Sequence, residues 1–246
     1  MRLLLFWFSI SWIIGLGTGC GSADTHDISD YYYPLDALEQ GVVYEYGPVK
    51  ADSLPEEYWY FRSMFTDSMD YLTANYYDHN FIVRQFTTEE IVENGALIRD
   101  YFLYTVDSMG LQSRVPAQIV GATAFPFEVR DSGGVFLTNL KWVFQENPEV
   151  SMTMIKNRRY AGKTTYDFKG KTYDCVVFDN KELVDDFNNG HWEKQYSGRE
   201  IFAKGLGLVY YEKKVDDNFV LEYKLRDTFD MEELEERFSG TLGWVN

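Results

Sequence analysis

The sequence predicts a mainly β fold, an antiparallel curved sheet arranged as a half-barrel or a sandwich, with a short C-terminal helix. Aromatic residues make up 17% of the 246 residues, and aromatic side chains are enriched on pleated, half-buried surfaces. Short runs of alternating apolar and polar residues recur from Tyr31 onward, separated by Gly, Asp and Asn. Few stretches have a helical period, which favours antiparallel neighbours over β-α-β units.

The clearest predicted strand covers 219–226, where Leu221, Tyr223 and Leu225 alternate with charged residues. A strand around Leu206 and Leu208 precedes it, and residues 215–219 supply the turn of a hairpin. Further strands are predicted over 41–49, 58–65, 80–86, 97–107, 113–120, 152–157, 160–168 and 172–178, with a tight turn at 169–171 joining the last two.

Helical patterns are few. Asp230 is a suitable N-cap for a helix over 231–238, in which Leu234 and Phe238 share a face and acidic residues fill the first turns. Weaker helical patterns cover 181–187 and 88–95. No proline-rich linker divides the chain, so we expect a leader over 1–19, an acidic flexible tether over 20–30 and a single domain over 31–246.

The N-terminus has the layout of a secretion signal. Arg2 is followed by an apolar run from Leu3 to Ile14, and this run is shorter than the roughly 20 residues that span a bilayer. The residues before Cys20 resemble the bacterial lipobox, although Gly17 stands where that motif has Leu. The resemblance implies cleavage before Cys20, attachment of lipid, including palmitate, to that cysteine, and a membrane anchor in the cell envelope. Because Gly21 stands where Asp signals inner-membrane retention, the resemblance implies the outer membrane, on its periplasmic or its surface side.

Two later segments carry a second resemblance. Residues 170–178 read Gly-Lys-Thr-Tyr-Asp-Cys-Val-Val-Phe, and residues 203–212 read Ala-Lys-Gly-Leu-Gly-Leu-Val-Tyr-Tyr-Glu. Together they resemble a strand pair in uncharacterised bacterial envelope lipoproteins. That resemblance implies a half-barrel of the LolA/LolB-like kind with a concave face, and it carries over no catalytic residue.

The charge and the cysteines restrict the partners. The net charge is −16, and it becomes −17 when a leader whose one charged residue is Arg2 is removed. Such a charge repels phosphate backbones, so nucleic acid is not expected as a partner. Cys175 is the one cysteine besides Cys20, and its Val-Val-Phe context predicts a small buried core residue rather than a nucleophile.

No set of residues predicts catalysis, metal binding or a cofactor. Residues 130–134 resemble the surround of a chymotrypsin-like serine nucleophile, but no histidine stands in that family's context. Asp186, Asn188 and Gly190 resemble the first half of a calcium loop, yet His191 stands where the loop needs Gly. The sequence therefore assigns no catalytic residue and no metal ligand, and it favours a protein that is not an enzyme.

The aromatic residues are the best candidates for ligand binding. Residues 58–61 form a continuous aromatic run, so both faces of that strand are aromatic, and Trp192 follows Gly190 and His191 in a loop-like stretch. Exposed rings stack on sugars or line apolar cavities. We therefore take Trp59, Tyr60 and Trp192 as candidate ligand-binding residues, with core packing as the alternative.

The leading functional hypothesis is a lipid-anchored envelope protein that binds either an apolar ligand such as a lipid, or a glycan, or another envelope protein. Two alternatives stay open: an envelope hydrolase that uses a carboxylate or calcium site, and a structural subunit of an envelope complex. Adjacent carboxylates such as Glu56-Glu57 and Glu89-Glu90 point to opposite faces of a strand. A hydrolase would therefore need folding to bring two carboxyl groups across one cleft.

Overall fold

A computed structural model describes residues 24–50, 54–106, 110–131, 133–144 and 147–239. The leader and Cys20 lie outside the described residues. The long strands are β2 (Val42–Pro48), β3 (Glu57–Phe65), β4 (Asp70–Tyr77), β5 (Val83–Val92), β6 (Gly95–Val106), β7 (Gln112–Pro126), β9 (Phe136–Phe144), β10 (Asn147–Phe168), β11 (Lys171–Phe187), β12 (His191–Ala203), β13 (Gly207–Lys214) and β14 (Val220–Phe229). The short elements are β1 (Thr25–Asp27), β8 (Glu128–Arg130), the 3-10 helices η1 (Ser29–Tyr31) and η2 (Leu35–Leu38), and the helix α1 (Met231–Ser239).

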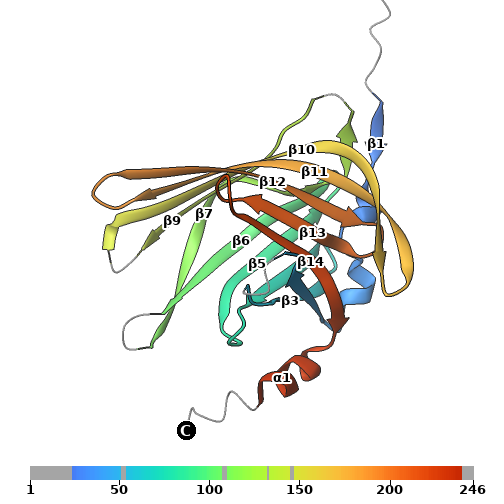
Figure 1. Ribbon diagram of the computed structural model, residues 1–246, viewed down its shortest axis with the longest axis horizontal. Coiled ribbons are helices and arrows are strands. Elements are labelled where there is room, and N and C mark those ends of the chain that lie inside the picture. The colour runs from blue at the N-terminus through green and yellow to red at the C-terminus, as the bar shows by residue number, and fades with distance from the viewer. Residues whose placement is uncertain (1–23, 51–53, 107–109, 132, 145–146, 240–246) are drawn as a thin grey trace, which may run out of the picture.

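The long strands close into one antiparallel barrel (Figure 1). Around the ring each strand lies between its neighbours in the sequence, apart from the short β8, which pairs with β1 instead. The ring closes where β14, the last strand, pairs with β2, the first. The expectation of a half-barrel or a sandwich is therefore wrong. Closure gives every long strand a hydrogen-bonded neighbour on each side along part of its length. Alternation along single strands does not show whether the first and last of them meet.

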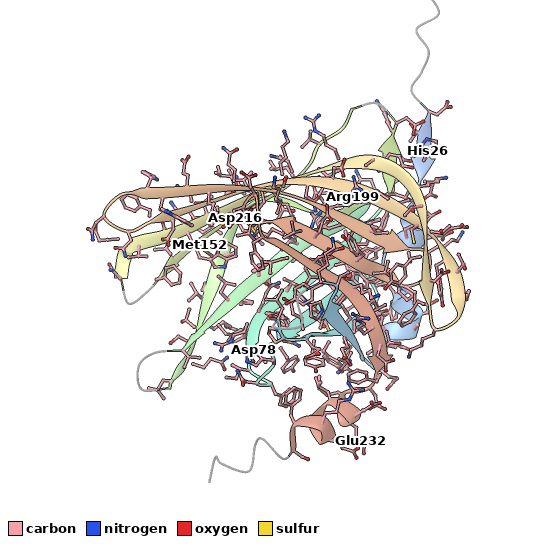
Figure 2. The ribbon with its side chains drawn as sticks, viewed as in Figure 1. His26, Asp78, Met152, Arg199, Asp216 and Glu232 are labelled. Atoms are coloured by element: carbon pink, nitrogen blue, oxygen red, sulfur yellow. The ribbon has the colours of Figure 1, made fainter. Side chains whose placement is uncertain are left out.

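Both hairpin turns expected from the sequence are confirmed. Lys169 and Gly170 have φ angles of 48° and 78°, as a tight two-residue turn between paired strands requires. They join β10 to β11 in register from Phe168 and Lys171 onward. Between β13 and β14, the Asp216 carboxylate (Figure 2) accepts hydrogen bonds from the backbone N–H groups of Asn218 and Phe219.

Several element predictions are wrong. Residues 181–187 form no helix but the end of β11, which pairs along this length with both β10 and β12. Residues 88–95 form the β5–β6 hairpin rather than a helix. The two strands expected over 152–157 and 160–168 are one strand, β10, with an irregularity between Tyr160 and Gly162. Three of the long strands, β4, β9 and β12, had no counterpart in the prediction, and neither had the short strands β1 and β8. Pairing on both sides stabilises a strand whose own sequence is polar or mixed.

The C-terminal helix forms as predicted and covers part of the outer wall. The Asp230 carboxylate accepts a hydrogen bond from the Glu233 N–H at 2.8 Å, which caps the first turn. Leu234 is fully buried against Val43 and Tyr58, whereas Glu232 (Figure 2) lies on the exposed side. This packing buries the outward-facing aromatic residues of β3, so α1 has a structural role.

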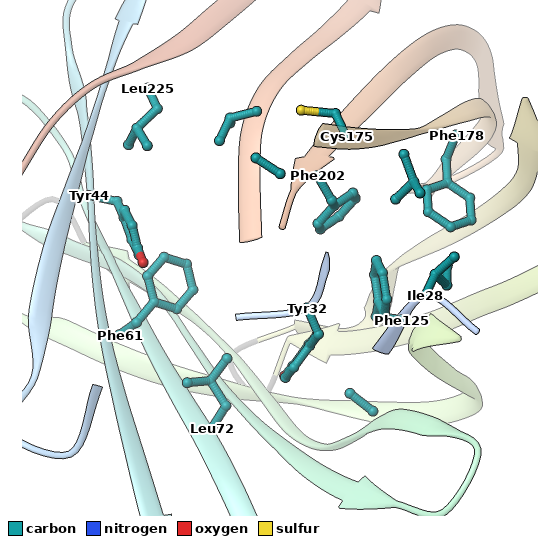
Figure 3. Close-up of a cluster of buried hydrophobic side chains, with 14 of the residues drawn as sticks. Ile28, Tyr32, Tyr44, Phe61, Leu72, Phe125, Cys175, Phe178, Phe202 and Leu225 are labelled. Atoms are coloured by element: carbon teal, nitrogen blue, oxygen red, sulfur yellow. The ribbon is translucent and has the colours of Figure 1, made fainter. Parts of the chain in front are cut away.

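The segment 28–38 enters the barrel and closes one end. Ile28, Tyr32 and Leu38 are 1%, 4% and 1% exposed, and Tyr32 packs against Phe125 in the core cluster (Figure 3). The fold begins earlier than residue 31, because β1 pairs with β8 from Thr25. The C-terminal half of the expected tether over 20–30 is therefore part of the domain.

Candidate functional site

Strand β3 shows how the wall is divided into an inner and an outer face. Trp59 and Phe61 point into the barrel, where they line a cavity. Tyr58 and Tyr60 alternate with them and pack on the outside, together with Val43 and with Leu234 of α1, in a group that we call the α1 cluster. The period of two along a strand produces this division, and the continuous aromatic run thus serves two separate surfaces.

The cavity has a volume of about 420 Å³ and lies between segment 28–38 and the opposite end of the barrel. Volumes of about 300–1,000 Å³ are typical of sites for small ligands. Its wall is mostly aromatic and apolar, with five charged side chains among its lining residues. The aromatic lining residues are Tyr32, Tyr33, Tyr46, Trp59, Phe61, Tyr76, Tyr101, Phe125, Phe202 and Tyr211, and the charged ones are Glu57, Glu89, Lys156, Arg158 and Glu200.

Glu200 on β12 is the centre of a buried ionic cluster. Its carboxylate accepts hydrogen bonds from Lys156 Nζ at 2.5 Å and from Arg158 Nε at 2.7 Å. Arg158 also donates to the Thr138 hydroxyl at 3.1 Å, which fixes the guanidinium against β9. Burial alone would raise the pKa of Glu200, but Arg158 and Lys156 hold this pKa at about 2. Glu200 is therefore ionised at neutral pH.

Glu89 lies at the floor of the cavity. The Tyr32 hydroxyl donates a hydrogen bond to its carboxylate at 2.6 Å, which ties segment 28–38 to β5. Burial raises the pKa of Glu89, while the Tyr32 hydrogen bond and the nearby Arg158 oppose that rise. The adjacent Glu90 forms an ion pair with Arg99 instead, so these neighbours have separate partners, as alternation along a strand predicts.

Glu57 lies on the cavity wall near the strand ends opposite segment 28–38. The Tyr211 hydroxyl and the Trp59 ring N–H donate hydrogen bonds to its carboxylate. Burial raises the pKa of Glu57, and these two hydrogen bonds oppose the rise. Among the described residues, no Lys, Arg or His forms an ion pair with it.

The three aromatic candidates from the sequence do not come together. Trp59 lines the cavity, and its ring stacks on Tyr76 with 5.1 Å between ring centres. Tyr60 lies on the outer face beside the α1 cluster. Trp192, at the start of β12, is 58% exposed and follows the β11–β12 turn. Ligand binding by these residues stays a prediction, with Trp59 the one that lines the cavity.

The residues that sequence reasoning missed are Lys156, Arg158 and Glu200 of the barrel interior, whereas Glu57 and Glu89 had been noted as members of adjacent carboxylate pairs. Met154, Lys156 and Arg158 recur at every second position of β10 and all line the cavity. Charged residues that share one face of a strand with an apolar residue, at a spacing of two, are the signal that could have indicated Lys156 and Arg158. Glu200 lies on β12, which was not predicted as a strand. The sequence alone therefore did not show on which face of a strand Glu200 lies.

The other chemical motifs lie apart from the cavity. Asn188 and Gly190 form the turn between β11 and β12, where His191 contacts the Asp185 carboxylate at 3.0 Å. His79 is bonded to Asn80 in the turn after β4. Neither histidine lines the cavity. Across the described part of the chain, no three His, Cys, Asp or Glu residues gather in an arrangement that could hold a metal ion.

Cys175 lies in the core, as its sequence context predicts. It is fully buried on β11 and has no disulfide partner among the described residues. Burial raises the pKa of its thiol to about 11, and Asp174 adds to the rise. The thiol is therefore protonated at neutral pH and unreactive.

These features define the class of the fold: a closed up-and-down β-barrel with an N-terminal plug and a partly charged internal cavity. Among solved structures, the chain is similar to a predicted lipoprotein from Parabacteroides distasonis, with 12% identity, a TM-score of 0.53, and coverage of 81% of this chain and 98% of that chain. A predicted exported protein with a YmcC-like fold from Bacteroides fragilis matches with 9% identity, a TM-score of 0.49, and coverage of 81% and 99%. The hypothetical lipoprotein YmcC from Escherichia coli matches with 12% identity, a TM-score of 0.32, and coverage of 79% and 88%. The first of these supports the fold alone.

The sequence itself matches no family model and no curated protein. Within the described ranges, none of the helices combines the length and the apolar character needed to cross a membrane.

Proposed function

We propose that this protein is a bacterial envelope lipoprotein whose barrel interior binds a small molecule with both apolar and charged parts. The observation that carries the binding function is the cavity of about 420 Å³, in which a largely aromatic wall surrounds Glu57 and the Glu200 cluster. Interior charges are costly to bury, and two of the lining carboxylates, Glu57 and Glu89, form no ion pair among the described residues. A ligand with matching polar groups accounts for their presence.

The envelope location rests on the N-terminal sequence. The apolar leader and the small residues before Cys20 favour export, cleavage and lipid attachment, and Gly21 favours delivery to the outer membrane. The strongly acidic net charge of −16 fits a domain held beside, rather than inserted among, anionic headgroups.

Lipid attachment predicts that the wild-type chain, produced in a bacterial host, incorporates labelled palmitate and that Cys20→Ala does not. Cys175→Ala is the matched control, because it removes the one other cysteine of the chain while leaving the lipobox intact. Label should persist in that control. Equal label in wild type and Cys20→Ala, or label in neither, would contradict the lipoprotein assignment.

Ligand binding predicts that a bulky side chain inside the barrel expels a co-purifying molecule. Ala74 on β4 is 4% exposed, lines the cavity and lies between Phe61 and Thr87 in register. Native mass spectrometry of the full chain from its producing cells should detect a bound small molecule in wild type and much less in Ala74→Phe.

The matched control for that experiment is Thr73→Phe, one residue earlier on the same strand. Thr73 faces the other side of the wall and donates its hydroxyl to the Arg62 carbonyl. This variant should retain the ligand. A wild-type protein that carries no small molecule, or equal loss in both variants, would contradict binding in the cavity.

A further inference from the structure

The charges that line the cavity are unbalanced by one. Three carboxylates, Glu57, Glu89 and Glu200, face two cations, Lys156 and Arg158. Glu200 forms ion pairs with both cations. The positive charge of Arg158 also lowers the pKa of Glu89. Within the part of the chain that the structure describes, Glu89 forms no ion pair of its own and has only the nearby charge of Arg158. Glu57 forms no ion pair either, and no cation among the described residues acts on its pKa. A half-buried carboxylate of this kind is stabilised by a proton or by a bound positive charge.

Aromatic rings surround this carboxylate. Trp59, which is bonded to Glu57, stacks on Tyr76. Tyr211, which is also bonded to Glu57, stacks on Tyr223 with an interplanar angle of 11°. We call Glu57, Trp59, Tyr76 and Tyr211 the Glu57 site; all four line the cavity. The faces of Trp and Tyr rings attract cations, and most strongly where water is excluded.

Apolar side chains continue from the Glu57 site into the rest of the cavity. Phe61 follows Trp59 on the inner face of β3, and Ile98 and Met154 lie on the facing strands β6 and β10. This arrangement provides a charged end and an apolar end within one cavity.

We propose that the Glu57 site takes the positively charged end of an organic ammonium compound, whose apolar part lies against Phe61, Ile98 and Met154. This inference rests on the proposed binding function and names the chemical class of its ligand. A ring-lined carboxylate favours a soft, weakly hydrated cation over a metal ion, because metal ions such as Ca²⁺ require several oxygen ligands. The ammonium would supply the one positive charge that the cavity lacks.

Three probes of similar size and different charge test this inference: 2-phenylethylammonium, 2-phenylethanol and 3-phenylpropanoate. Their dissociation constants are measured by titration calorimetry on the full chain in phosphatidylcholine nanodiscs, with empty nanodiscs as the blank. At pH 8 the ammonium should bind at least tenfold more tightly than the alcohol, and the propanoate more weakly than both. In Glu57→Gln the ammonium should lose this advantage, while the affinity for the alcohol stays unchanged and confirms an intact cavity.

Glu56→Gln is the matched control, because Glu56 is adjacent and exposed and its removal changes the net charge by the same amount. It should leave all three affinities unchanged. Equal losses in both Glu variants would assign the effect to the overall charge and overturn the inference. Equal affinities of the three probes, all abolished by Ala74→Phe, would preserve cavity binding and overturn the cationic class. Affinities that Ala74→Phe leaves unaltered would also overturn the inference, and so would the absence of binding by any probe. In either case, native mass spectrometry of the co-purified molecule would still test the proposed function independently.

Discussion

Replacing Glu200 with Gln should lower the free energy of unfolding by about 3 to 5 kcal/mol, because it leaves two buried cations without their carboxylate. The side chains of Glu200, Arg158 and Lys156 are 7%, 13% and 21% exposed, so water compensates little. For a domain of this size, the expected decrease in Tm is roughly 6 to 20 °C. Thermal and urea unfolding of the two proteins measure it.

The matched control uses the neighbouring position on β12, whose partner lies on the adjacent strand β11. Asp179 and Arg199 lie opposite one another in register and form an ion pair at 3.0 Å, but their side chains are 55% and 49% exposed. Asp179→Asn should cost less than about 1 kcal/mol. Similar losses in both variants would contradict the assignment of Glu200 to a buried ionic cluster.

The same carboxylate makes the stability depend on pH. The pKa of Glu200 is about 2 in the folded protein, below its ordinary value of 4.5. The contribution of the Glu200 carboxylate to the free energy of unfolding is therefore fully present above about pH 5, and it is lost as the pH falls through about 2. The difference in unfolding free energy between wild type and Glu200→Gln should stay constant from pH 7 to 5 and shrink below pH 4. A difference that grows on acidification would contradict this.

Truncating Tyr32 to Ala should cost about 3 to 5 kcal/mol, the range for large buried rings. Tyr32 is 4% exposed, and its ring centre lies 5.6 Å from that of Phe125 and 5.9 Å from that of Phe127. Tyr32→Phe keeps the ring and removes only the hydroxyl that donates to Glu89, so it should cost about 1 to 3 kcal/mol. Urea unfolding of the three proteins measures both differences.

Asp36→Ala is the control within the same segment, because Asp36 is exposed on η2 and should change the stability by less than about 0.5 kcal/mol. If Tyr32→Ala were as mild as this control, segment 28–38 would not be part of the folded core. A loss in Tyr32→Phe as large as in Tyr32→Ala would instead assign the whole effect to the hydrogen bond with Glu89.

The parts of the fold that could be predicted from the sequence are those that local chemistry determines. The turn at Lys169 and Gly170, the alternating strand β14 and the Asp230-capped helix each carry their own pattern. The polar strand β12 does not, because it is stabilised by pairing with β11 along its whole length and with β13 from Ser197 to Ala203. Closure of the barrel depends on the pairing of β14 with β2, which lie more than 170 residues apart, and no local pattern contains that information.

The candidate site also has a part that local sequence indicates and a part that depends on distant strands. Trp59 could be proposed from its aromatic context, but the sequence did not separate it from Tyr60, because the inner and outer faces of β3 are both aromatic. What separates them is the position of α1, which covers Tyr58 and Tyr60 from outside. The partners of Glu200 come from β10, more than 40 residues away. Such a cluster becomes visible only when the strands are placed in register.

The pairing of β1 with β8 also bears on how the domain would stand relative to a membrane. Thr25, the first residue of β1, is five residues after Cys20, and an extended chain covers at most about 3.6 Å per residue, or about 18 Å over that distance. A lipid on Cys20 would therefore hold the plugged end of the barrel close to the bilayer. Glu57, Tyr76 and Gln85 lie near the opposite strand ends. In that orientation a ligand would reach the cavity from the aqueous compartment rather than directly from the lipid.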